Sequence, residues 1–440
     1  MGKIRKAVCT AGAALLSACM LGSCGLADLL PAPADRDAVS RPETAGTLTE
    51  ILSGLWEQQE ETPEQEEMRA VWVSYLDLSP LLKGKSEAEF AASAKELCQN
   101  CAAVGLNTLI VQVRPFCDSF YPSRYFPWSK WASGTLGEAL RYDPVRILRD
   151  EAGRQGLAFH GWLNPMRGCT EEEMPLVPEE YPVRQWYDDP DAREENLMIV
   201  DGIVYLNPAS PDVRKLIADG AAEIQENYRT DGIHIDDYFY PPGMEESADS
   251  ASYQAYLSQG GTLDLAAWRR ENTFAMVKEL SAAVHETDPA ARFGVSPRGS
   301  LEQNYSDLYI DVEQWIQSGI LDYIAPQIYY GFENDAAPFD ETARQWDRLA
   351  RAGGVPLIAG LAAYKVGKTD AYAGGGASEW IESEDLLARQ ILFARDLPAY
   401  GGLILFRYGS LFDPPEETAE AAMRAQSIWA PLLLEEPSQP

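Results

Sequence analysis

Two adjacent carboxylates, Asp236 and Asp237, follow a short apolar run in the stretch GIHIDDYFYPP (residues 232–242). Neighbouring negative charges repel each other, and a buried carboxylate without a partner is costly. If a cation such as Arg114 or Arg407 neutralises one acid, the other is free to act as an acid, a base or a nucleophile. The alternative is purely structural: both acids form salt bridges or close a turn at the end of the strand.

The elements that position this pair form a repeating pattern. Eight apolar runs read as strands, over residues 69–76, 107–115, 157–165, 231–240, 292–297, 322–330, 355–364 and 401–409. Helix-periodic stretches lie between them, and several open on Ser or Asp and close on Gly, as helices often do. Eight strands alternating with helices are what a (β/α)8 barrel requires. We therefore predict an α/β fold, a TIM barrel over residues 68–432, with a tail over residues 433–440.

In such a barrel, active groups gather where the strands end. Side chains alternate along a strand, so His234 and Asp236 are expected to point into the barrel and Ile233 and Ile235 towards the helices. Asp237 falls at the end of the strand, free to turn towards the rim or to pair with an arginine.

The N-terminus has the layout of an export signal, with a basic start and an apolar run over residues 7–16 that is too short to span a bilayer. LSAC, ending at Cys19, and LGSC, ending at Cys24, both resemble the bacterial lipoprotein box. We favour Cys24 as the lipidation site, which makes residues 1–23 the signal peptide. A plain secretory peptide is the alternative.

Residues 24–67 are rich in Pro, Glu and Gln and poor in apolar groups, which predicts a disordered acidic tether. The expected location is extracytoplasmic, on the bacterial cell membrane and held there only by the lipid anchor. The whole chain has 36 Lys and Arg against 68 Asp and Glu, a formal charge of −32. This charge argues against nucleic acid as a partner.

Sequence motifs at most of the predicted strand ends resemble those of the glycosyl hydrolase-like 10 family of bacterial cell-envelope proteins. The resemblance covers about residues 68–412 and rests on NTLIVQVRPFCDSFYPS, AFHGWLNPMR, YLNPASPDVR, DGIHIDDYFYPP, VSPRG, DYIAPQIYYGFE and IAGLAAYKVG. It implies a (β/α)8 barrel that hydrolyses glycosidic bonds of a polysaccharide, with peptidoglycan glycan strands as the substrate class.

The resemblance also suggests roles for the carboxylates. Asp236 looks like the aspartate that acts as nucleophile after strand four in related barrel glycosidases. The second catalytic carboxyl is Asp237 or Glu333, with Asp118 as a further possibility. Two such carboxyls lie about 5 Å apart in retaining enzymes and about 6.5–9.5 Å apart in inverting ones, and the sequence leaves both outcomes open.

Other residues at the strand ends suit a sugar, because they offer hydrogen bonds to hydroxyl and N-acetyl groups or flat faces for stacking. For each aromatic residue, packing in the core or at the rim is the commoner role. The candidate substrate-binding residues are Arg114, Asp118, His160, Trp162, Asn164, His234, Tyr238, Gln327, Tyr329, Tyr330 and Arg407.

We predict neither a metal nor a cofactor, since the chain has three histidines, no HExxH motif and no repeated Cys pair at zinc spacing. Cys117 and Cys169 follow adjacent predicted strands, so one hypothesis is a disulfide across the barrel mouth. Two other classes of function stay open: a carbohydrate-binding lipoprotein whose barrel has lost catalysis, and a scaffold protein.

Overall fold

The computed structural model describes residues 66–435. The predicted signal peptide, the lipidation site Cys24 with its alternative Cys19, and nearly all of the predicted tether lie outside this range. None of the helices between residues 66 and 435 is both long enough and apolar enough to cross a membrane.

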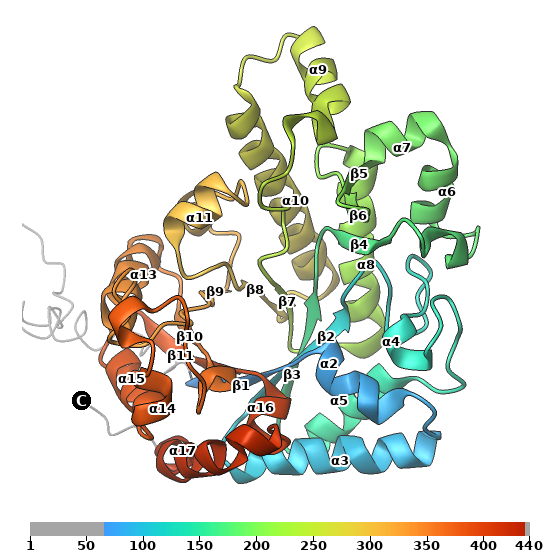
Figure 1. The fold of residues 1–440 in the computed structure, drawn as a ribbon. Helices are drawn as coiled ribbons and strands as arrows, with labels where there is room; N and C mark the ends of the chain where they lie inside the picture. The colour runs from blue at the N-terminus through green and yellow to red at the C-terminus, as the bar shows by residue number, and fades with distance from the viewer. Residues whose placement is uncertain (1–65, 436–440) are drawn as a thin grey trace, which may run out of the picture. The chain divides into compact units, whose positions relative to one another are not determined.

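Eight parallel strands close into a barrel with the neighbour order β1-β11-β10-β9-β8-β7-β3-β2 (Figure 1). The strands are β1 (Met68–Val73), β2 (Thr108–Arg114), β3 (Ala158–Leu163), β7 (Gly232–Ile235), β8 (Arg292–Val295), β9 (Tyr323–Ile324), β10 (Leu357–Leu361) and β11 (Tyr400–Phe406). Each overlaps one of the eight predicted runs. The prediction of a (β/α)8 barrel is confirmed.

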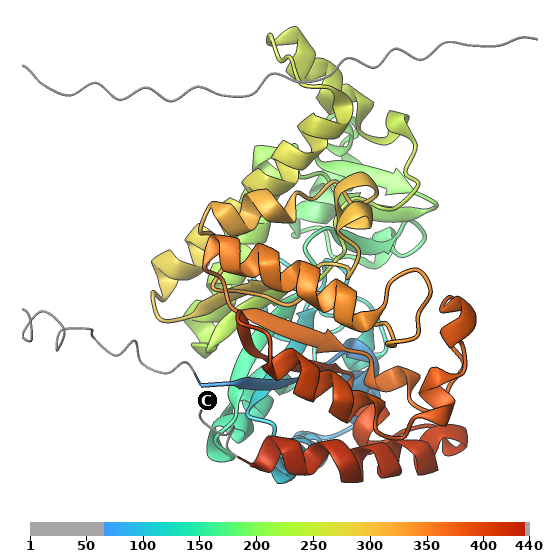
Figure 2. The same ribbon diagram turned by 90° about the vertical axis from the view of Figure 1, so that its left-hand side faces the viewer.

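Helices surround the ring of strands. The longer ones are α3 (Glu87–Ala103), α5 (Pro144–Arg154), α8 (Pro211–Tyr228), α10 (Leu265–Thr287), α13 (Phe339–Gly353), α15 (Leu386–Arg395) and α17 (Glu416–Leu434). Shorter helices are α2 (Tyr75–Leu82), α4 (Lys130–Ser133), α6 (Pro182–Asp188), α7 (Pro190–Asn196), α9 (Ser250–Ser258), α11 (Leu301–Ser306), α12 (Val312–Gln317), α14 (Glu379–Glu382) and α16 (Tyr408–Phe412). Figure 2 shows α13, α15 and α17, coloured orange to red, side by side across one side of the barrel.

Local capping explains several helix starts. The Ser86 side chain accepts the backbone N–H of Glu89, and the Glu89 carboxylate accepts the N–H of Ser86 in return. Asp143 and Ser210 cap α5 and α8 in the same sense, each accepting a backbone N–H of the first turn. The last helix continues past the predicted start of the tail at residue 433, because the buried Leu433 still packs in the core.

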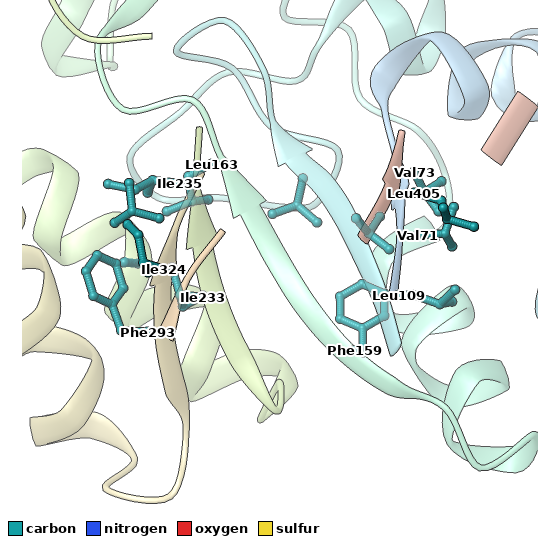
Figure 3. Packing of buried hydrophobic residues seen from close by; sticks show 14 of the residues in the cluster. Val71, Val73, Leu109, Phe159, Leu163, Ile233, Ile235, Phe293, Ile324 and Leu405 are labelled. Carbon is teal, nitrogen blue, oxygen red and sulfur yellow. The ribbon is translucent and has the colours of Figure 1, made fainter. Parts of the chain in front are cut away.

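The alternation of side chains along the strands separates two apolar layers. Ile233 and Ile235 belong to the layer between strands and helices, as predicted, together with residues such as Val71, Leu109 and Phe293 (Figure 3). A smaller group fills the interior of the barrel: Met68, Ala70, Trp72, Ile110, Trp162, Tyr323, Ala325, Ile358 and Ile404. The interior is therefore a packed core, and a ligand has room only at its end.

A three-stranded antiparallel sheet, which we did not predict, is inserted between β3 and α8. It consists of β4 (Arg167–Thr170), β5 (Leu197–Val200) and β6 (Ile203–Leu206), in the order β4-β6-β5. Close pairing of β4 with β6 depends on Gly168, since a Cβ there would lie 2.6 Å from the carbonyl oxygen of Val204. The insertion places Arg167 four residues after the end of β3, beside the barrel mouth.

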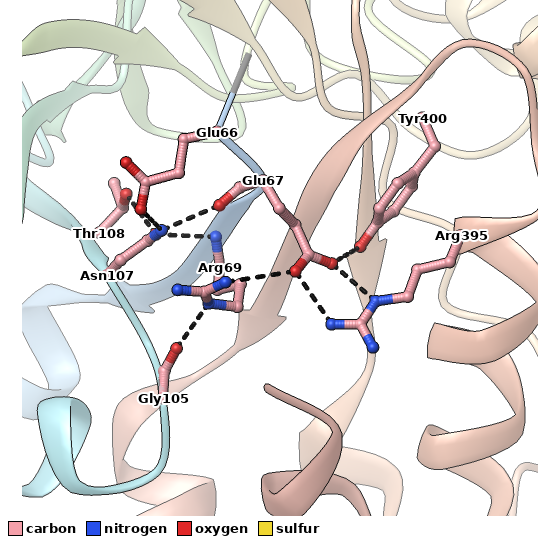
Figure 4. A network of polar contacts seen from close by, with 8 residues as sticks. All are labelled: Glu66, Glu67, Arg69, Gly105, Asn107, Thr108, Arg395 and Tyr400. Carbon is pink, nitrogen blue, oxygen red and sulfur yellow. Dashed lines mark hydrogen bonds and ion pairs between the residues drawn. The ribbon is translucent and has the colours of Figure 1, made fainter. Parts of the chain in front are cut away.

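A polar network around Glu67 lies at the opposite end of the barrel, where β1 and β11 begin (Figure 4). The Glu67 carboxylate accepts hydrogen bonds from Arg395 at 2.8 and 2.9 Å and from the Tyr400 hydroxyl at 2.6 Å. Arg69 adds a longer contact at 3.4 Å. We placed Glu67 in the tether, but it is buried and belongs to the barrel, because it joins the start of β1 to the start of β11.

Candidate active site

A cavity of about 380 Å³ opens at the carboxyl ends of the barrel strands. Every strand, or the segment directly after it, contributes to its wall. In strand order β1, β2, β3, β7, β8, β9, β10 and β11, the lining includes Ser74, Gln112, Asn164, Asp236, Ser296, Gln327, Tyr364 and Phe406. Trp72, Tyr75, Phe116, Trp162, Arg167, Asp237, Tyr238 and Tyr329 also line it. We call this space the mouth cavity.

Asp236 lies in the wall of the mouth cavity and is almost fully buried. Its Oδ2 accepts the indole N–H of Trp162 at 2.8 Å, and its Oδ1 accepts the backbone N–H of Tyr238 at 3.2 Å. Burial and the neighbouring charge of Asp237 raise the pKa of Asp236 to about 8, although the two hydrogen bonds and Arg167 act in the opposite direction. These surroundings favour the protonated form of Asp236.

Asp237 has a different environment. Arg298 forms an ion pair with its Oδ2 at 3.2 Å, and the Gln327 side-chain amide donates to its Oδ1 at 3.0 Å. A cation and an amide donor suit an ionised carboxylate. The cation is Arg298 rather than Arg114 or Arg407, which we had considered for this role.

The structure thus resolves the energetic problem of two adjacent acids by giving them different surroundings. One carboxyl is buried against an indole, while the other is paired with a guanidinium. Acid catalysis at a glycosidic bond needs one carboxyl that holds a proton and a second carboxyl nearby. Such a pair can supply a proton donor and a negative charge in the same cavity.

His160 and His234 point into the barrel as expected for His234, but they form part of its polar core rather than the wall of the mouth cavity. The indole N–H of Trp72 can only donate, so His234 Nε2, 3.3 Å away, accepts and its Nδ1 carries the proton. Nδ1 then donates to the Tyr323 hydroxyl at 2.9 Å, which in turn donates to His160 Nδ1 at 3.0 Å. Burial lowers the pKa of both imidazoles, that of His160 to about 3.

Five of the predicted substrate-binding residues line the mouth cavity: Trp162, Asn164, Tyr238, Gln327 and Tyr329. Tyr238 presents the most exposed ring of these, with 42% of its surface accessible. Asn164 is buried and accepts the backbone N–H of Arg167, so it also fixes the start of β4. These five remain predicted sugar contacts.

Glu333 does not belong to the mouth cavity. It is exposed and lines a separate acidic cavity with Glu379, Glu382, Glu384 and Asp385. The segment after β9 turns outwards there, because the backbone N–H groups of residues 332 and 333 donate to the buried Glu379 carboxylate. Glu333 is therefore removed from the candidate catalytic pair.

Four further candidates lie away from the wall of the mouth cavity. Arg114 is fully buried with its guanidinium 4.6 Å from the centre of the Phe126 ring. Arg407 is ion-paired with Asp77. Tyr330 packs close to Gly299, and Asp118 faces a second, smaller cavity. For these four residues, the expected role in the mouth cavity is not supported.

Sequence reasoning missed Trp72, Tyr75, Phe116, Arg167 and Arg298. Arg167 and Arg298 stand in the quoted motifs AFHGWLNPMR and VSPRG, directly after predicted strands, so the motif itself was the available signal. Their importance depends on three-dimensional partners, which strand periodicity does not reveal.

Cys117 and Cys169 are free thiols in the structure, so the hypothesis of a disulfide between them is not supported. Burial raises the pKa of each thiol to about 12. Within residues 66–435, no group of three or more His, Cys, Asp and Glu side chains is arranged to hold a metal ion.

The chain is similar to proteins that are named glycosyl hydrolases. Glycosyl hydrolase YngK of Bacillus subtilis (strain 168) is 33% identical over 369 residues, which cover 79% of this chain and 69% of that protein. Glycosyl hydrolase DigH of Escherichia coli (strain K12) is 31% identical over 400 residues, which cover 82% of this chain and 87% of that protein.

Among solved structures, the PgaB (BpsB) glycoside hydrolase domain of Bordetella bronchiseptica has the same fold. It aligns with a TM-score of 0.54 at 14% sequence identity, over 82% of this chain and 99% of that domain. Residues 67–373, from β1 to beyond β10, match the family described as glycosyl hydrolase-like 10. The chain therefore belongs to the glycosyl hydrolase-like 10 family, which groups it with the glycoside hydrolases.

Proposed function

We propose that this protein hydrolyses glycosidic bonds of peptidoglycan glycan strands, with Asp236 as the general acid. The observation that carries the proposal is a buried Asp236, whose pKa is raised, beside an ion-paired Asp237 in one cavity at the barrel mouth. Membership of the glycosyl hydrolase-like 10 family supports the reaction type. The names of YngK and DigH support it as well.

The proposed mechanism begins with proton transfer from Asp236 to the oxygen of the leaving sugar. A protonated carboxyl is a poor nucleophile, so its state at neutral pH favours the acid role over the nucleophile role suggested by the family resemblance. Departure of the leaving group puts positive charge on the sugar ring. Asp237, held by Arg298 and Gln327, provides negative charge near that ring. A water molecule then adds to the anomeric carbon, and the proton that it loses returns to the Asp236 carboxylate.

The cavity wall supports a carbohydrate substrate. Tyr238 and Trp162 offer ring surface to pyranose faces, while Asn164 and Gln112 offer amide groups to hydroxyls. Peptidoglycan is proposed because the family resemblance links its members to the bacterial cell envelope. Export fits this substrate, and we propose that lipidated Cys24, or alternatively Cys19, tethers the protein to the outer face of the cell membrane.

The proposed reaction is tested by digesting purified glycan strands and reading the products by mass. Asp236→Asn keeps the shape of the side chain but cannot donate the proton, so product release should fall by about 10²-fold or more. Glu333→Gln is the matched control, since this acid lies outside the mouth cavity, and it should retain wild-type activity.

Equal product release by wild type and Asp236→Asn would contradict the hydrolase proposal. Binding of the strands without hydrolysis by the wild type would instead favour a carbohydrate-binding protein. The proposed anchoring is tested by cell fractionation: Cys24→Ala should move the protein out of the membrane fraction, and retention there would point to Cys19.

A further inference from the structure

A second cavity of about 200 Å³ adjoins the mouth cavity. We call it the side cavity. Tyr75, Phe116 and Arg167 line both spaces, so the two share a wall. The rings of Tyr75 and Trp131 lie 4.8 Å apart and those of Tyr75 and Phe116 5.0 Å apart, which makes one side of the side cavity a continuous aromatic surface.

Arg167 stands at the junction of the two cavities. Its guanidinium lies over the Phe116 ring at 4.5 Å and over the Tyr238 ring at 4.8 Å. Its backbone N–H is held by the Asn164 side chain, 3.1 Å away. Stacking between two rings fixes a guanidinium without using its N–H donors.

Those donors have no partner among residues 66–435. No hydrogen bond or ion pair joins the Arg167 side chain to any described residue, although the group is partly buried. A guanidinium has five N–H donors in a planar fork that matches a carboxylate or carbonyl oxygen. These donors are therefore available to a ligand that enters at the junction of the two cavities.

The other charged groups of the side cavity already have partners within the described structure. Lys130 is ion-paired with Glu173. The Asp118 carboxyl accepts the backbone N–H of Phe116 at 2.9 Å, and its burial raises its pKa to about 6. Arg167 is thus the group that gives the side cavity its binding preference, which is for oxygen acceptors.

We propose that Arg167 and the side cavity form a subsite for a short substituent on the sugar ring, namely an acyl or carboxyalkyl group. Its oxygen receives the Arg167 donors, and its methyl group lies on the rings of Phe116 and Trp131. The side cavity has about half the volume of the mouth cavity, which suits a substituent better than a second sugar ring. This inference rests on the proposed function, because it requires a sugar in the mouth cavity.

The test compares three β-1,4-linked glycans that differ in their substituents. Cellohexaose has none, chitohexaose has acetamido groups, and peptide-free wall glycan strands have acetamido and carboxyl-bearing lactyl groups. Binding is measured by calorimetry in the Asp236→Asn background, where hydrolysis does not interfere. Arg167→Gln should weaken binding of substituted glycans about tenfold and change binding of cellohexaose less than about twofold.

The pattern identifies the substituent. Equal losses for chitohexaose and wall glycan assign the acyl group, and a loss for wall glycan alone assigns the carboxylate. Arg270→Gln is the matched control, since Arg270 also stacks on a tyrosine ring, that of Tyr305 at 3.9 Å, but lines neither cavity. It should bind all three glycans like the parent.

An equal effect of Arg167→Gln on all three glycans, or no effect on any, would overturn the subsite. If Arg167→Gln does not fold, Cys169→Leu replaces it, because the larger side chain fills the side cavity and should give the same pattern. A parent protein that binds none of the glycans would overturn the proposed function together with the subsite. An Arg167-dependent pattern in a wild type that cleaves no glycan would leave the subsite standing and refute hydrolysis alone.

Discussion

Two buried acids, Glu67 at one end of the barrel and Asp236 at the other, have opposite electrostatic surroundings. Burial by itself raises the pKa of Glu67, but hydrogen bonds from Arg395 and Tyr400 bring it below its usual value. Asp236 has an indole and a backbone N–H as donors and a second acid next to it, and its pKa rises to about 8. Glu67 is held ionised, whereas Asp236 is held protonated.

The difference shows how this barrel separates stability from chemistry. At the amino ends of the strands, Arg395 and Arg69 compensate the charge of Glu67. The hydrogen bonds of this carboxylate connect the start of β1 to the start of β11. At the carboxyl ends, Arg298 forms an ion pair with Asp237, whereas Arg167 offsets only part of the rise in the pKa of Asp236. A site for proton transfer needs an acid whose pKa lies near the working pH, and incomplete compensation produces it.

Of the substitutions that test this difference between Glu67 and Asp236, Asp236→Asn should have the largest effect. We expect kcat to fall about 10²–10⁴-fold, as for loss of a general acid. Stability should not fall, because the amide cannot ionise and its oxygen can still accept the indole N–H of Trp162. The pKa of Asp236 is higher in the folded protein than in the unfolded chain. Its contribution to the stability of the wild type is therefore lost progressively as the pH rises from about 4 to about 8. The gain in Tm of Asp236→Asn over wild type should therefore grow across this range in thermal unfolding scans.

Glu67→Gln should do the reverse. Removing one member of a buried ion pair leaves Arg395 without compensation and should lower the free energy of unfolding by roughly 2–4 kcal/mol. Because the folded pKa of Glu67 is lowered, this difference is present above about pH 4 and shrinks as the pH falls below it. Urea unfolding measures the loss, and KM should stay unchanged. A change in KM with intact stability would contradict the assigned roles.

The third effect is on the pH dependence of the reaction. If protonated Asp236 donates the proton, kcat/KM should fall about tenfold per pH unit above roughly pH 8, where this carboxyl ionises in the free enzyme. Initial rates on glycan strands between neutral pH and pH 10 test this. A flat alkaline limb would show that another group supplies the proton.

The smallest expected effect concerns Trp162→Phe, which removes the 2.8 Å hydrogen bond to Asp236 and keeps an aromatic ring. This bond favours the charged carboxylate, so its loss should move the alkaline limb upwards by about half a unit to one unit. Tyr75→Phe is a suitable control, because it changes the same cavity without touching Asp236. A downward shift for Trp162→Phe would reverse the role given to the indole.

The sequence by itself determined the barrel and the position of its mouth. Apolar runs at regular spacing give eight strands, and the two-residue period of a strand sends Ile233 and Ile235 outwards and Asp236 to the inner wall. Strand periodicity and apolar runs depend only on residues that are close together in the chain, so the sequence shows them directly. The three-stranded sheet after β3 escaped prediction because it is inserted between β3 and α8, outside the alternation of strands and helices from which the barrel was predicted.

Only the tertiary structure decided which side chains work together. Arg298 reaches Asp237 across 61 positions in the chain, and Gln327 reaches it across 90. Glu333, although it follows a barrel strand, turns outwards to the loop held by Glu379. The protonation of an acid depends on its burial and on its distance from charged partners elsewhere in the chain. Both are properties of the closed barrel, so the order of residues alone does not reveal them.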